Sequence, residues 1–80
     1  MMKNCTIKIN TMEDACRVCA LVNEFVWDVD GACGRYLIDM KSILGIMSIG
    51  FGREIDVYLH TEYVNMQEEL RNDLEEWRVK

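Results

Sequence analysis

The N-terminal part of the chain alternates apolar and polar side chains and then changes to helical spacing. Cys5, Ile7 and Ile9 alternate with polar neighbours, and this period of two predicts a half-buried strand. The apolar positions that follow recur at helical spacing, which predicts an amphipathic helix from about Met12 to Phe25. These apolar positions are Met12, Ala15, Cys19, Val22 and Val26.

Two further strands are predicted in the middle of the chain. The segments Trp27 to Cys33 and Tyr36 to Met40 are rich in apolar and β-branched or aromatic residues, and they meet at a turn near Gly34. Gly31 weakens the first of these strands, because glycine has no side chain to pack there.

The rest of the chain predicts a short helix, a strand and a longer helix. Ser42 to about Ile49 is an apolar helical segment, and the alternation over Ile55 to Leu59 predicts a fourth strand. The C-terminal helix carries an apolar stripe made of Tyr63, Met66, Leu70, Leu74 and Trp77. The resulting order, β-α-β-β-α-β-α, predicts a four-stranded sheet with helices covering one side.

The segment around Ser42 carries the most specific motif. Ser42 stands at the N-cap position of the short helix, where its hydroxyl can accept a hydrogen bond from a free backbone N–H. The run Lys41-Ser42-Ile43-Leu44-Gly45-Ile46-Met47-Ser48 resembles the regulatory-serine region of HPr, the phosphocarrier family of the bacterial sugar phosphotransferase system. This resemblance implies one α+β domain over residues 1–80: an open-faced β-sandwich whose four-stranded antiparallel sheet has three helices on one face.

The histidine that carries the phosphoryl group in that family is missing. Counted back from the regulatory serine without gaps, the histidine position falls on Thr11 and the arginine position on Glu13. If Arg17 is aligned with the family's arginine instead, the histidine position falls on Ala15. The chain has one histidine, His60, and it lies at the end of the fourth predicted strand. We therefore expect no histidine phosphocarrier activity and no other catalytic activity.

The resemblance implies a regulatory or protein-binding role instead. In the family, an HPr kinase phosphorylates the serine that matches Ser42, and the catabolite-repression HPr keeps this serine although it lacks the histidine. The implied partners are an HPr kinase-like enzyme, phosphotransferase-system components or a transcriptional regulator. The implied partner-binding residues are Lys41, Ile43, Leu44, Met47 and Phe51. Two simpler interpretations stay open, namely that Ser42 only caps the helix and that the apolar cluster only packs into the core.

The four cysteines suggest an alternative function of a different class from protein binding. Cys16 and Cys19 form a C-x-x-C pair that could serve as a redox or carrier group near a helix start. Zinc binding would require Cys5 or Cys33 to converge on this pair, and we expect neither a metal nor a cofactor. The interpretation that we favour is four reduced thiols, mostly in the core.

Composition and charge limit the partners and the location that we expect for the protein. The chain has 80 residues and a net charge of −5, which argues against nucleic acid as a partner. No apolar run is long enough to cross a bilayer, and the first residues lack the apolar core of a signal peptide. We therefore expect a cytoplasmic protein with protein partners and no membrane contact.

Overall fold

The strands and helices follow one another in the order that the hydrophobic pattern predicts. The computed structural model describes residues 2–79. Its elements are β1 (Cys5–Lys8), α1 (Met12–Val22), β2 (Val29–Cys33), β3 (Tyr36–Asp39), α2 (Ile43–Ile49), β4 (Glu54–Leu59), α3 (Val64–Asp73) and the short 3-10 helix η1 (Glu75–Trp77).

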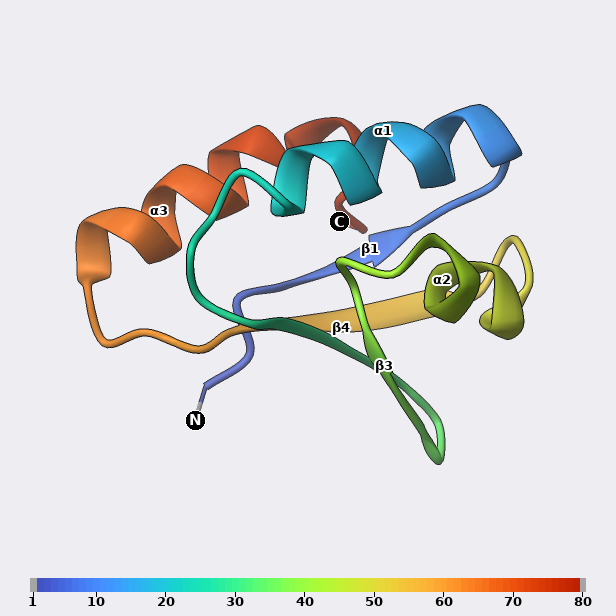
Figure 1. Cartoon of the computed structure of the whole chain (residues 1–80), viewed down its shortest axis with the longest axis horizontal. Helices are drawn as coiled ribbons and strands as arrows, with labels where there is room; N and C mark the ends of the chain where they lie inside the picture. Colours follow the sequence, from blue (N-terminus) through green and yellow to red (C-terminus); the bar gives the residue numbers. More distant parts are fainter. Residues whose placement is uncertain (1, 80) are drawn as a thin grey trace.

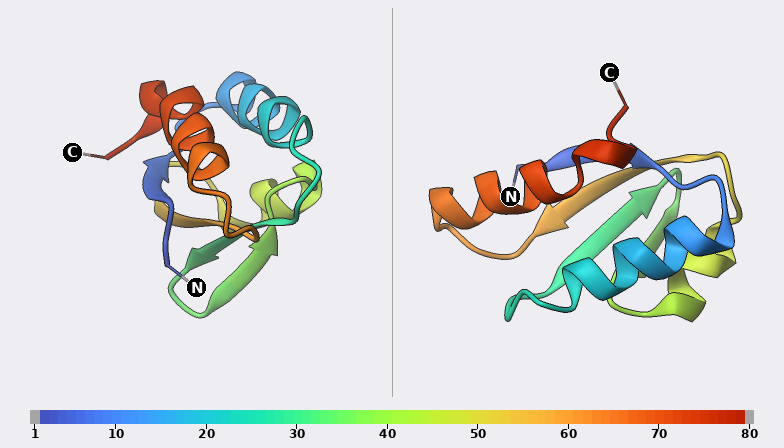
Figure 2. Two further views of the ribbon diagram at one scale, coloured as in Figure 1. Left: turned by 90° about the vertical axis from the view of Figure 1, so that its left-hand side faces the viewer. Right: turned by 90° about the horizontal axis from the view of Figure 1, so that it is seen from above.

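The four strands form one antiparallel sheet in the order β1-β4-β2-β3 (Figure 1). β2 and β3 are a hairpin that turns at Gly34, whose φ of 60° lies in the left-handed region that favours glycine. The last strand, β4, pairs with β1 on one side and with β2 on the other. The helices all lie on one face of this sheet, and the other face is open (Figure 2). The fold is therefore the α+β open-faced sandwich that was predicted.

The core fills the space between the sheet and the helices. Alternate residues of β4, namely Ile55, Val57 and Leu59, are almost completely buried, as the period of two predicts. The helices contribute a matching set of buried side chains. These are Ala15, Val18 and Val22 of α1, Ile46 and Ile49 of α2, and Leu70 of α3.

Gly31 lies in β2 because a side chain would not fit there. A Cβ atom at this position would approach the sulfur of Met40 to 2.5 Å and Cγ2 of Ile55 to 2.9 Å. Met40 and Ile55 are both buried, so neither side chain can turn into solvent to make room. The glycine allows close packing on the helix-covered face of the strand.

The first helix ends earlier than predicted. α1 stops at Val22 instead of Phe25, and the side chain of Asn23 donates a hydrogen bond to the carbonyl of Cys19 at 2.8 Å. Val26 of the predicted apolar stripe therefore lies beyond the end of the helix, and 82% of its surface is exposed. Met12, at the start of the helix, is exposed as well.

The C-terminal helix also differs from the prediction at both ends. α3 ends at Asp73, and a separate 3-10 turn carries Trp77 into the core. Tyr63 precedes the helix and is exposed, with its ring 5.7 Å from the ring of Trp27. After the turn, the N–H of Val79 donates to the carbonyl of Thr6 at 2.8 Å, so the end of the chain lies along the outer edge of β1.

Within residues 2–79, none of the helices has the length and the apolar content needed to cross a bilayer.

Candidate protein-binding site around Ser42

Ser42 caps α2 as predicted. Its backbone is extended, with φ −103° and ψ 117°, and its Oγ accepts a hydrogen bond from the N–H of Gly45 at 3.2 Å. The N–H of Ser42 donates to the carbonyl of Asp39 at the end of β3. Both the strand that precedes the serine and the helix that follows it therefore fix its position.

α2 has one buried face and one exposed face. Ile46 and Ile49 are buried in the core, and Ile43 is half-buried against it. On the other face, Leu44 and Met47 have 78% and 37% of their surfaces exposed, and Phe51, which follows the helix, has 45% exposed. We call the group formed by Ser42, Leu44, Met47 and Phe51 the Ser42 surface. It combines the capping hydroxyl with apolar side chains that the core does not cover.

Lys41 holds the segment before α2 against the end of α1. Its Nζ donates a hydrogen bond to the carbonyl of Phe25 at 2.5 Å, and its own carbonyl accepts bonds from the side chain of Asn23 at 3.1 Å and from the thiol of Cys19 at 3.4 Å. The ammonium group of Lys41 is thus engaged in a structural contact on the flank of the Ser42 surface.

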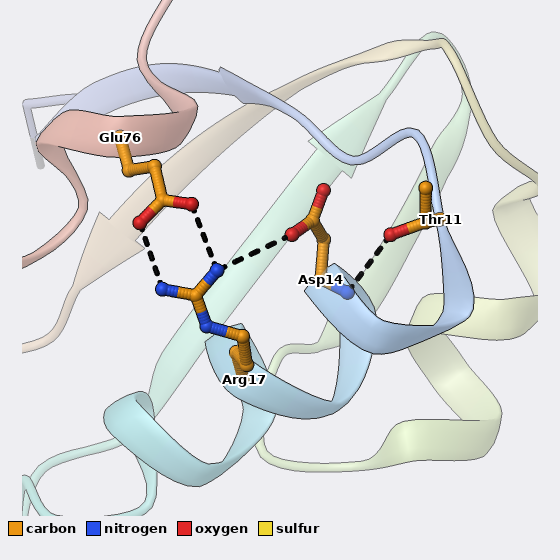
Figure 3. A network of polar contacts seen from close by, with 4 residues as sticks. All are labelled: Thr11, Asp14, Arg17 and Glu76. Atoms are coloured by element: carbon orange, nitrogen blue, oxygen red, sulfur yellow. Dashed lines mark hydrogen bonds and ion pairs between the residues drawn. The ribbon is translucent and has the colours of Figure 1, made fainter.

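The start of α1 has a cap of the same kind but different surroundings. Thr11 Oγ1 accepts a hydrogen bond from the N–H of Asp14 at 3.1 Å (Figure 3). Ala15, the other candidate for the histidine position, is completely buried. Neither Thr11 nor Ala15 has a nitrogen atom in its side chain.

Arg17 is bound by the protein's own carboxylates. Its two terminal nitrogens contact both oxygens of Glu76 at 2.8 and 2.7 Å, and Asp14 lies 3.6 Å away (Figure 3). The guanidinium carbon is also 4.9 Å from the ring centroid of Trp77. The hydrogen bond to Arg17 lowers the pKa of Glu76, and the same bond raises the pKa of Arg17. The local sequence around Arg17 does not show its pairing with Glu76, because Glu76 lies 59 residues away and in another element.

His60 lies where the sequence placed it, just after β4. Its Nε2 is 2.6 Å from Oδ2 of Asp30 in the neighbouring strand β2. Asp30 also pairs with Asp39, the last residue of β3, so the His60–Asp30 pair lies at the end of the sheet from which the chain leads into α2.

All four cysteines are free thiols. Cys33 is buried, Cys5 and Cys19 are half-buried, and Cys16 is exposed. Burial is the largest influence on Cys5 and Cys19 and raises the pKa of both thiols, which disfavours the reactive thiolate at neutral pH. Within residues 2–79, no three His, Cys, Asp or Glu side chains come together as metal ligands would.

Comparison with protein-family models gives no match to this chain, and comparison with curated proteins gives none either.

Proposed function

We propose that this chain is an HPr-like regulatory or protein-binding domain that acts through the Ser42 surface and not as a histidine phosphocarrier. The observation that carries the proposal is the pairing of a helix-capping serine with exposed Leu44, Met47 and Phe51. The element order and the open-faced sandwich are compatible with the family that the Ser42 motif resembles. The partners we propose are the ones this resemblance implies: an HPr kinase-like enzyme, and phosphotransferase-system components or a transcriptional regulator.

The start of α1 supports the exclusion of phosphocarrier activity. A phosphohistidine needs a ring nitrogen and a free cation, and here the candidate positions are Thr11 and Ala15 while Arg17 is paired with Glu76. The carboxylates of Asp14 and Glu76 would also repel an incoming phosphoryl group.

The proposed switch is phosphorylation of Ser42. In this step the Ser42 Oγ attacks the γ-phosphorus of ATP, an O–P bond to the serine forms, the bond to ADP breaks, and the hydroxyl proton leaves to the kinase. The product adds about −2 charges at neutral pH directly beside Leu44, which changes which partners the apolar surface can bind. The nearby carboxylate of Asp39 accepts a hydrogen bond from the N–H of Lys41, so the new charge would also be close to an existing one.

Intact-mass spectrometry tests the proposed switch. The protein is incubated with an HPr kinase and ATP, and separately with enzyme I and phosphoenolpyruvate. We expect one added phosphate with the kinase and none with enzyme I. The matched variants are Ser42→Ala and Ser48→Ala, because Ser48 is an exposed serine of the same helix whose hydroxyl donates to the Gly45 carbonyl. The phosphate should disappear only in Ser42→Ala, and a phosphate from enzyme I would contradict the proposal.

The kinetics of the same reaction test the apolar part of the surface. Leu44→Ala should raise the KM for the protein substrate about tenfold, because an exposed anchor at an interface typically contributes about 1–2 kcal/mol. Leu37→Ala is the control, since Leu37 is an exposed leucine on β3, outside the Ser42 surface. Equal effects of the two variants would mean that the kinase does not dock on this surface.

A further inference from the structure

A groove runs along the flank of α1 that faces α3. α1 and α3 lie side by side on the sheet, and α2 lies on the other flank of α1 (Figure 2). One hollow of about 420 Å³ lies between α3 and the connection from α1 to β2, and a second of about 550 Å³ lies between α1 and Trp77. Glu24 lines both hollows, and we call the two hollows together the α1–α3 groove.

The rim of the α1–α3 groove is acidic. Glu24, Glu69 and Asp73 line it, and none of them forms an ion pair within residues 2–79. The one cationic side chain among the lining residues is Arg17, which Glu76 and Asp14 already neutralise. These three carboxylates therefore have no ion-pair partner within residues 2–79, and the ammonium group of Lys41 is bound to the carbonyl of Phe25, which also lines the groove.

The floor of the groove is apolar. Phe25, Val26, Trp27 and Met66 line the hollow beside α3. Val26 is strongly exposed because α1 ends before it, and Trp27 is half-buried with Tyr63 packed against its ring. An apolar floor between acidic edges matches a ligand that has one apolar face and basic flanks.

We propose that the α1–α3 groove binds a cationic amphipathic helix of a partner protein. Such a helix places apolar side chains on Val26 and Trp27 while its Lys or Arg side chains meet Glu24, Glu69 and Asp73. A second copy of this chain is disfavoured, because each copy carries a net charge of −5 and would bring more carboxylates to the same edges. The groove shares no residue with the Ser42 surface.

Binding of a synthetic helix tests the charge requirement. The probe is a fluorescent, tryptophan-free peptide with leucines on one helical face and lysines on the other, and the control probe has glutamates in place of the lysines. Fluorescence anisotropy should show saturable binding of the lysine peptide and none of the glutamate peptide. The groove variant is Glu69→Lys with Asp73→Lys. The control variant is Glu62→Lys with Glu68→Lys, which makes the same change in net charge at exposed positions outside the groove.

The two charge variants separate site binding from general attraction. We expect the groove variant to weaken binding of the lysine peptide by at least about tenfold and the control variant by less than about twofold. Equal weakening by both variants would show attraction by net charge alone and would overturn the proposal. Absence of binding to the unmodified protein would overturn it as well. Circular dichroism spectra of the variants show that each remains folded.

A second pair of variants tests the apolar floor. Val26→Ser should weaken peptide binding several-fold, whereas Leu37→Ser removes an equally exposed apolar side chain elsewhere and should leave binding unchanged. Sedimentation of the free protein provides the remaining control. A dimer that Val26→Ser dissociates would assign the groove to a second copy and would overturn the proposal, and a monomer supports it.

Discussion

α1 and α2 both begin at a hydroxyl side chain, but their surroundings differ in charge. Thr11 and Ser42 have extended backbones, and each accepts a hydrogen bond from the backbone N–H three residues later. The first turn of α1 contains Glu13 and Asp14, whereas the first turn of α2 contains no acidic side chain. The first helical turn is therefore acidic at α1 and free of carboxylates at α2, where the carboxylate of Asp39 lies before the cap.

The two helix starts also differ in the contacts of the residues near them. At α1, Glu76 binds both terminal nitrogens of Arg17, so the cation that could stabilise a phosphoryl group is used to join α1 to η1. At α2, Leu44 and Met47 follow the capping serine in the helix, and both are exposed. This contrast is the basis for proposing the Ser42 surface, and not the start of α1, as the binding site.

The largest expected change in the free energy of unfolding distinguishes the buried face of α2 from its exposed face. Ile46→Ala should lower the free energy of unfolding by about 2–5 kcal/mol, because Ile46 is fully packed in the core. Leu44→Ala should change it by less than about 0.5 kcal/mol, because Leu44 is mostly exposed. Urea unfolding followed by circular dichroism measures both. A large cost for Leu44→Ala would mean that this side chain is structural and would remove the main support for a binding surface.

The next largest loss of stability is expected when either N-cap side chain is removed. Ser42→Ala and Thr11→Ala should each destabilise the protein by about 1 kcal/mol, because each leaves a backbone N–H without its side-chain acceptor. Ser42→Asp should recover most of this loss, since aspartate is an equally good N-cap residue. Urea unfolding of the three variants measures the changes. If Ser42→Ala were neutral, the serine would be unnecessary for the helix, and its presence would argue more strongly for phosphorylation.

Local patterns predicted most of the fold but not the ends of the helices. The alternation over Ile55 to Leu59 reports directly which side chains face the core, so β4 was predicted correctly. The end of α1 depends on Asn23, whose side chain bonds both to Cys19 in the helix and to the carbonyl of Lys41. Because the second contact joins segments that are distant in the chain, the periodicity of the first helix could not show that Val26 lies outside it.

The same distinction applies to the candidate site. Ser42 was predicted as a cap because the capping bond spans only three residues and the residue type is characteristic. The pairing of Arg17 with Glu76 was not predicted, because η1 brings the two residues together across most of the chain. For the same reason the α1–α3 groove could not be predicted from the sequence, because Glu69 and Asp73 meet Glu24 only in the folded chain.

The smallest expected effect tests the charge at the start of α1. The pKa of Glu76 is lowered in the folded state, mainly by its hydrogen bond to Arg17, so the pair adds stability above the ordinary carboxyl value of 4.5. That contribution is lost as the pH falls from this value through the lower folded-state pKa. Glu76→Gln should therefore be slightly less stable than the natural chain at pH 7, and the difference should vanish in acid and shrink in high salt.

Glu75→Gln is the matched control for Glu76→Gln. Glu75 is the neighbouring carboxylate, and its one contact with Arg78, at 3.7 Å, is longer than either contact between Arg17 and Glu76. Urea unfolding between pH 3 and pH 8 should show a flatter acid limb for Glu76→Gln and an unchanged one for Glu75→Gln. Identical pH profiles for the two variants would mean that Glu76 does not hold Arg17 in solution. Arg17 would then be free to bind an anion, and the contrast between the starts of α1 and α2 would be lost.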